Sequence, residues 1–150
     1  MWSPPDATGQ SPDALPARSG DNAVPTDVPS AAALEAQADD ARSAGDNGQA
    51  AAALERLVAL HPRDPRVPGA LFTLGRVERA RGMVGASARA FERCFAVAPG
   101  GPLAQDAIIE AAQAWSSAGN DDAARQDATK YLRRWPQGAA ADRMRTISQK

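Results

Sequence analysis

The sequence contains very little of the chemistry that most enzymes use. Among its 150 residues there is one cysteine, Cys94, and one histidine, His61. A single cysteine excludes an internal disulfide framework, and a single histidine excludes a multi-histidine metal site. No glycine-rich phosphate loop, HExxH motif or CxxC motif occurs. The sequence therefore argues against an enzyme and predicts no catalytic residue, no cofactor and no metal site.

The few reactive residues have structural interpretations. Cys94 falls in an amphipathic helical segment, where we expect a buried small apolar side chain rather than a nucleophile. His61 precedes Pro62 in a turn, and we expect it to be solvated. Asp121 and Asp122 are adjacent, so their side chains diverge on a helix. They fit a helix start, where the helix dipole favours acids.

Long apolar runs and a strong net charge are also missing. No stretch approaches the roughly 18 apolar residues that read as a membrane span, and the first ten residues lack the regions of a signal peptide. With a formal net charge of −1, no global field draws the chain to nucleic acid. We expect no membrane insertion and no small-molecule substrate. Nucleic-acid binding, through the arginines of residues 63–93, is a less favoured alternative. The compartment is cytoplasmic if Met1 is the native start, and periplasmic or envelope, the preferred interpretation, if the chain is part of an anchored protein.

The first 30 residues show no apolar periodicity. They contain six of the 12 prolines, and such a segment buries too little apolar surface to offset its ordering entropy. We expect residues 1–30 to be a disordered, Pro-rich linker or tail. From Ala31 onward, Ala, Leu and Arg dominate and β-branched residues are few, which predicts an all-α domain over 31–150.

Two sets of helix-breaking residues recur every 37 residues in this domain: the glycines Gly45, Gly82 and Gly119, and the prolines Pro62, Pro99 and Pro136. Glycine adopts the left-handed conformation that ends a helix, and proline lacks the N–H that continues one. The period predicts three helix-turn-helix units at about 31–67, 68–104 and 105–136, and a capping helix at 138–148. We expect first helices at 31–44, 68–81 and 103–118, and second helices at 47–60, 84–97 and 121–134.

The second unit resembles the tetratricopeptide repeat (TPR), whose pattern is matched by Leu71, Leu74, Gly75, Phe91 and Pro99. Two residues depart from this pattern. Glu78 stands where the family has an aromatic residue, and Ser87 stands where it has a small alanine. The resemblance covers residues 31–136 and implies a right-handed superhelix of stacked hairpins. The period of 37 residues is longer than the roughly 34 residues of the common TPR. In this respect the chain also resembles bacterial envelope repeats of the BamD and YbgF type, and the C-terminal repeats of FecR-like anti-sigma regulators.

Gly75 lies inside a predicted helix, where glycine costs about 1 kcal/mol relative to alanine. Its counterparts at the repeat period are Ala38 and Ala112, which are also small. We expect these three residues to mark the place where the two helices of each hairpin cross most closely.

The resemblance implies that the first helices line a concave face that receives a peptide or helix of a partner protein. The outward positions on these helices are the predicted binding residues: Glu35, Asp39, Arg42, Phe72, Arg76, Arg79, Ile109 and Gln113. The chain is thus interpreted as a non-catalytic interaction scaffold. Self-association into a homo-oligomer, and docking of the acidic tail onto the domain itself, are alternatives.

Three of these residues have competing interpretations. Phe72 is either an exposed aromatic anchor of the kind that dominates interface energy or a side chain that packs against a neighbouring hairpin. Arg76 and Arg79 lie one turn apart and could bind carboxylates of a partner bidentately. They could equally form a solvated charged face, because exposed ion pairs contribute little.

Overall fold

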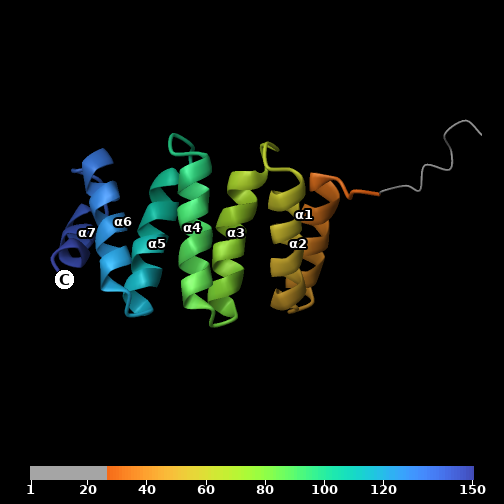
Figure 1. Ribbon diagram of the computed structural model, residues 1–150, viewed down its shortest axis with the longest axis horizontal. Coiled ribbons are helices and arrows are strands. Elements are labelled where there is room, and N and C mark those ends of the chain that lie inside the picture. The colour runs from red at the N-terminus through yellow and green to blue at the C-terminus, as the bar shows by residue number, and fades with distance from the viewer. Residues whose placement is uncertain (1–26) are drawn as a thin grey trace, which may run out of the picture.

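The computed structural model describes residues 27–150, which form seven α-helices and no strand (Figure 1). Residues 1–26 of the predicted linker lie outside the described residues. The helices are α1 (Ala31–Ser43), α2 (Asn47–Leu60), α3 (Val67–Ala80), α4 (Val84–Val97), α5 (Ala104–Ser117), α6 (Asp121–Arg134) and α7 (Ala141–Ser148). The second helix of each hairpin has the predicted bounds. Among the first helices, α1 ends one residue earlier than predicted, and α3 and α5 differ from prediction by one residue at both ends.

A glycine ends the first helix of every hairpin. Gly45, Gly82 and Gly119 have φ angles of 77°, 76° and 76°, and no other described residue has a positive φ. The next helix then begins on a side-chain cap in two hairpins: Asp46 accepts a hydrogen bond from the N–H of Gln49, and Asn120 accepts one from the N–H of Ala123. The left-handed turn and the cap together reverse the chain in very few residues.

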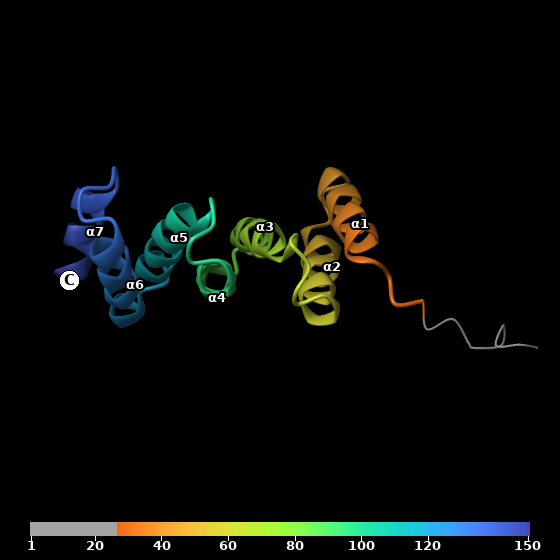
Figure 2. The same cartoon turned by 90° about the horizontal axis from the view of Figure 1, so that it is seen from above.

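Each helix packs mainly against its neighbours in sequence, from α1 with α2 through to α6 with α7. Seen from above, α1, α3, α5 and α7 form one row, and α2, α4 and α6 form the other (Figure 2). The array curves toward the first row. A hairpin whose apolar face is covered only by the next hairpin is the architecture of a solenoid, and the chain is an all-α helical-repeat superhelix.

Large apolar side chains from both rows meet in the interior. Leu34, Leu71 and Ile108 occupy the same position in the three first helices, and each is fully buried. Phe91 and Tyr131 are the largest buried side chains of the second helices. At about 25 cal/mol per Å² of buried apolar surface, these recurring contacts supply the main force that holds neighbouring hairpins together.

The capping helix begins three residues later than predicted, at Ala141 rather than at residue 138. Its start follows those of α3 and α5, at Val67 and Ala104, at the repeat period. In the turn before α7, the hydroxyl of Tyr131 accepts a hydrogen bond from the N–H of Ala140 and fills the space beside Gly138. A Cβ on Gly138 would lie 2.2 Å from that hydroxyl oxygen. Residues 136–140 form a turn beside the tyrosine, at the same repeat positions as the turns that precede α3 and α5.

Candidate partner-binding surface

The eight predicted binding residues lie on α1, α3 and α5, all in the row toward which the array curves (Figure 2). We call them the inner surface: Glu35, Asp39, Arg42, Phe72, Arg76, Arg79, Ile109 and Gln113. Five are exposed or half-buried charged residues, and none of the eight is fully buried. All eight therefore belong to helices of one row, and most of their charged side chains are paired with one another or with other residues of the protein.

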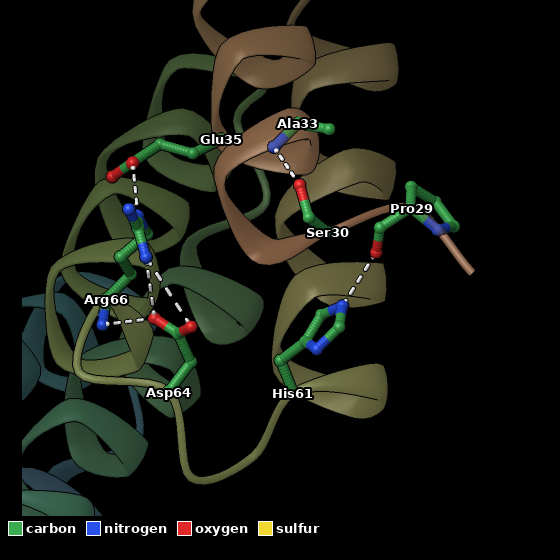
Figure 3. A network of polar contacts seen from close by, with 7 residues as sticks. All are labelled: Pro29, Ser30, Ala33, Glu35, His61, Asp64 and Arg66. Atoms are coloured by element: carbon green, nitrogen blue, oxygen red, sulfur yellow. Dashed lines mark hydrogen bonds and ion pairs between the residues drawn. The ribbon is translucent and has the colours of Figure 1, made fainter. Parts of the chain in front are cut away.

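Glu35 is paired with Arg66, which lies in the turn before α3 (Figure 3). Arg66 Nε donates to Glu35 Oε2 at 3.1 Å, and the same guanidinium lies 3.3 Å from Asp64 Oδ1. The N–H of Arg66 donates to Asp64 at 2.9 Å, and this bond is the main reason that the pKa of Asp64 falls below its ordinary value. The network ties the first unit to the loop that leads into the second.

Two more pairs engage inner-surface charges. Asp39 accepts a hydrogen bond from Arg42 Nη1 at 3.0 Å, one turn along α1. Arg79 on α3 is paired with Glu110 on α5, and this pair joins the second and third units. Arg79 also lies over the ring of Phe91, with its Cζ 5.3 Å from the ring centroid. Arg79 is therefore largely engaged within the protein.

Arg76 differs from the other inner-surface cations. It is exposed, and no carboxylate of residues 27–150 forms an ion pair with it. Arg76 and Arg42 line a shallow hollow of about 290 Å³ together with Asn47, Val77 and Ala80. Two guanidinium groups and an amide at one hollow form a donor set suited to a carboxylate.

Phe72 is half-buried and packs against Phe91 of its own hairpin. The ring centroids are 5.1 Å apart, and the planes meet edge to face at 68°. One part of the Phe72 ring therefore belongs to the core, and the remainder is open to solvent. The packing interpretation named the wrong neighbour, because Phe72 packs against α4 of its own hairpin rather than against another hairpin. The role of Phe72 as an anchor for a partner stays a prediction.

The third unit offers a less charged stretch of the inner surface. Ile109 and Gln113 are both half-buried on α5. Near the C-terminus, Lys150 Nζ donates to the hydroxyl of Ser116 at 3.0 Å. The inner surface thus changes from charged on α1 to mixed on α3 and to apolar and neutral on α5.

Cys94 behaves as predicted, and His61 does not. Cys94 is 1% exposed, and burial raises the pKa of its thiol to about 11, which makes it a poor nucleophile. His61 is half-buried, and its Nε2 donates to the carbonyl oxygen of Pro29 at 2.7 Å (Figure 3). The expectation of a solvated turn residue was therefore wrong. Through this hydrogen bond, the His61 side chain holds the segment just before α1 in place.

Two buried acids on the second and third units were not predicted as partners of other residues. Glu78, which stands where the resemblance calls for an aromatic, accepts two hydrogen bonds of 2.9 Å from Arg81. Asp127 is fully buried on α6 and accepts a hydrogen bond from Lys130 Nζ at 2.8 Å. A comparison of position 127 with its repeat counterparts, Ala53 and Ala90, would have pointed to this acid.

No three His, Cys, Asp or Glu side chains among residues 27–150 gather into an arrangement that could hold a metal ion. In the same part of the chain, no helix is both long enough and apolar enough to span a bilayer.

The helical array is similar to solved TPR structures. The chain superposes on the MamA protein with a TM-score of 0.60, at 23% identity over 74% of this chain and 57% of that one. It superposes equally well, with a TM-score of 0.60, on nearly identical TPR-like repeats of a putative kinesin light chain of Podosopora anserina, at 16% identity over 79% of this chain and 63% of that one. The chain therefore spans about three fifths of the length of these structures.

No family model and no curated protein matches the sequence. The structural likeness nevertheless establishes the fold: the chain has the fold of tetratricopeptide-repeat proteins.

Proposed function

We propose that the chain is a non-catalytic protein–protein interaction scaffold that binds a peptide or helix of a partner on its inner surface. The observation that carries this proposal is the hollow between Arg42 and Arg76, which lies one helical turn from the half-open ring of Phe72. The hollow suits an acidic side chain, and the ring suits an apolar one. An unpaired guanidinium beside a partly exposed aromatic is a typical arrangement of interface hot spots.

The remaining ion pairs support the same proposal. Glu35 with Arg66 and Arg79 with Glu110 each join residues 31 positions apart in sequence. Exposed pairs of this kind contribute only about 0–1 kcal/mol each to folding. They do, however, hold long side chains in fixed positions, so that less rotamer freedom is lost when a partner binds.

The proposal is tested by binding of peptides selected by display against residues 27–150. We expect Arg76→Glu and Phe72→Ala each to weaken binding by about tenfold or more, which corresponds to about 1.4 kcal/mol. Arg56→Glu is the matched control, because Arg56 is exposed on α2 and has no ion-pair partner among the described residues. It makes the same change of charge on the other row of helices, and we expect unchanged affinity.

Thermal unfolding of every variant accompanies the titrations, since Phe72 also contacts Phe91. Unchanged affinity in both inner-surface variants, or equal weakening by Arg56→Glu, would contradict the proposal.

The repeat period of 37 residues supports placing this scaffold in a bacterial envelope or regulatory assembly. Fractionation of cells that express the native gene tests the location. Recovery with the envelope is expected, and exclusive recovery with cytosolic protein would contradict an envelope role.

A further inference from the structure

Asp127 is a buried acid at a position where the other two units carry alanine. It lies on α6, it is 0% exposed, and its repeat counterparts are Ala53 and Ala90. Lys130 Nζ donates to its Oδ1 at 2.8 Å, whereas Oδ2 is buried and has no hydrogen-bond partner among the described residues. Buried polar atoms are nearly always hydrogen-bonded. A proton on this carboxyl group would turn one of its oxygens into a donor.

A second carboxyl group, that of Glu92 on α4, lies beside Asp127. Burial is the main reason that the pKa of Asp127 rises to about 6, against the opposing hydrogen bond and charge of Lys130. The charge of Glu92 and a hydrogen bond between the two carboxyl groups raise this pKa further. Two ionised carboxylates can only accept hydrogen bonds, so such a bond exists only while one of them carries a proton.

Glu92 is in turn bonded to the first helix of the third unit. Its Oε1 accepts a hydrogen bond from Trp115 Nε1 on α5 at 2.8 Å. Arg89 of α4 lies over the Trp115 ring, with its Cζ 5.8 Å from the ring centroid. The side chains of Glu92, Trp115 and Asp127 therefore connect α4, α5 and α6 in one cluster that spans the second and third units.

The charged side chains of the surrounding helices leave this cluster with few cations. On α4, Arg93 is paired with an acid of α2, and on α5, Glu110 is paired with a cation of α3. α7 packs against α6 with apolar side chains. Lys130 is the cation paired with Asp127, and no cation of residues 27–150 forms an ion pair with Glu92. The two carboxyl groups thus have one ion-pair partner between them.

We propose that Asp127 and Glu92 share one proton, and that the resulting hydrogen bond is a pH-dependent clasp between the second and third units. As the pH falls, Asp127 takes up the proton from water, and its hydroxyl donates to a carboxylate oxygen of Glu92. This bond joins α6 to α4. As the pH rises, the proton returns to water and two negative charges face each other, which weakens the contact. The clasp goes beyond the proposed function, because none of its residues belongs to the inner surface.

The full chain, labelled with carbon-13 and nitrogen-15 and followed by NMR from about pH 4.5 to about pH 8, tests the proposal. The Asp127 carboxyl carbon reports the proton directly, and the Trp115 indole N–H reports it through Glu92. We expect the two signals to titrate with one common midpoint near pH 6. They should agree because the proton on Asp127 binds the same carboxylate that accepts from the indole.

Glu92→Gln keeps an oxygen that can accept from the Trp115 indole, but it removes the charge and the shared proton. We expect the Asp127 midpoint to fall by about one pH unit or more, because the neighbouring negative charge no longer disfavours ionisation. Glu55→Gln is the matched control, because Glu55 stands at the same repeat position one unit earlier. We expect it to leave the midpoint unchanged.

Asp127→Asn tests the clasp itself, because its side-chain amide offers a donor to Glu92 at every pH. We compare hydrogen exchange of the α6 amides in this variant and in the wild type. We expect equal exchange at about pH 5, and about tenfold slower exchange in the variant at about pH 7.5, where the wild-type clasp is open.

Four results would each overturn the proposal. They are an unchanged Asp127 midpoint in Glu92→Gln, an equal fall of that midpoint in Glu55→Gln, different midpoints for the Asp127 and Trp115 signals, and equal α6 exchange in Asp127→Asn and the wild type at the higher pH. The first would show that burial alone holds the proton on Asp127.

Discussion

Gly75 of α3 and Phe91 of α4 are in contact with no room for another atom between them. A Cβ added to Gly75 would lie 2.7 Å from two ring carbons of Phe91. The ring is fully buried and is held on its sides by Phe72 and Arg79, so it cannot easily move away. The glycine is present because the second unit places a large aromatic where the two helices cross.

Gly75→Ala is expected to destabilise the protein. Overpacking a core costs about 1–3 kcal/mol, and the gain of about 1 kcal/mol from replacing a helical glycine offsets only part of this. Urea unfolding measures the change. Gly69→Ala is the control in the same helix, because a Cβ there meets nothing within 4 Å, and it should be neutral or stabilising. Equal behaviour of the two variants would contradict the steric explanation.

The first unit carries a compensating pair at the same two positions. Ala38 and Leu54 stand where Gly75 and Phe91 stand one unit later. The double variant Gly75→Ala with Phe91→Leu should therefore lose less stability than the sum of the two single variants, with a coupling of about 0.5–3 kcal/mol. Strictly additive effects in the double-mutant cycle would show that the two positions do not share one space.

Ser87→Ala is expected to cost about 0.5–1.5 kcal/mol in free energy of unfolding. The hydroxyl of Ser87 is buried and donates to the carbonyl oxygen of Gly75 at 2.7 Å, so it joins the two helices at their crossing. Urea titration provides the measurement, and Ser117→Ala, at an exposed position of α5, is the control. A Ser87→Ala variant as stable as the wild type would show that this hydrogen bond contributes nothing net.

His61→Ala is expected to loosen the start of α1 without affecting the rest of the array. The hydrogen bond from His61 fixes Pro29, and the next residue, Ser30, caps α1 by accepting from the N–H of Ala33 at 3.0 Å. Loss of about 1 kcal/mol locally should speed exchange of the Ala33 and Leu34 amides about fivefold in hydrogen-exchange NMR. Amides of α5 and α6 serve as the internal control. A uniform change across all helices would contradict a local role.

Asp127→Ala is expected to raise stability, most strongly at high pH. The folded-state pKa of Asp127, about 6, lies above its ordinary value of 3.8, so the folded state holds the proton more tightly than the unfolded chain. The free energy of unfolding of the wild type therefore rises as the pH falls through 6 toward 4, and it falls as the pH rises. The groups that face Asp127 are Lys130 on α6 and Glu92 on α4.

Urea unfolding of the wild type and Asp127→Ala over a series of pH values measures this dependence. The stability difference between them should shrink by about 1–3 kcal/mol from about pH 8 to about pH 4. Taking the difference removes the contribution of the other carboxylates. A gap that stays constant with pH would show that Asp127 titrates alike in the folded and unfolded states.

Features carried by a single segment of sequence were predictable. The left-handed turns follow from Gly45, Gly82 and Gly119, because only glycine adopts that conformation cheaply. The close crossing at Gly75 follows from the cost of a glycine in a helix. Both depend on local backbone preferences, which act whatever the rest of the chain does.

Features that depend on the register between helices could not be predicted. Arg79 pairs with Glu110, 31 residues away, and Arg93 pairs with Glu55, 38 residues away. Which charge meets which depends on the rotation of neighbouring helices, and exposed pairs are too weak to leave a sequence signal. For this reason the sequence predicted which positions form the inner surface. It did not predict that, among residues 27–150, Arg76 is the one inner-surface arginine without an ion-pair partner.

The central claim is that the inner surface is where a partner binds. Chemical-shift mapping with a display-selected peptide, in nitrogen-15 spectra of residues 27–150, tests it most directly. The account predicts perturbed amides and side chains concentrated on α1, α3 and α5 around Arg42, Phe72 and Arg76. Perturbations confined to α2, α4 and α6 would contradict it.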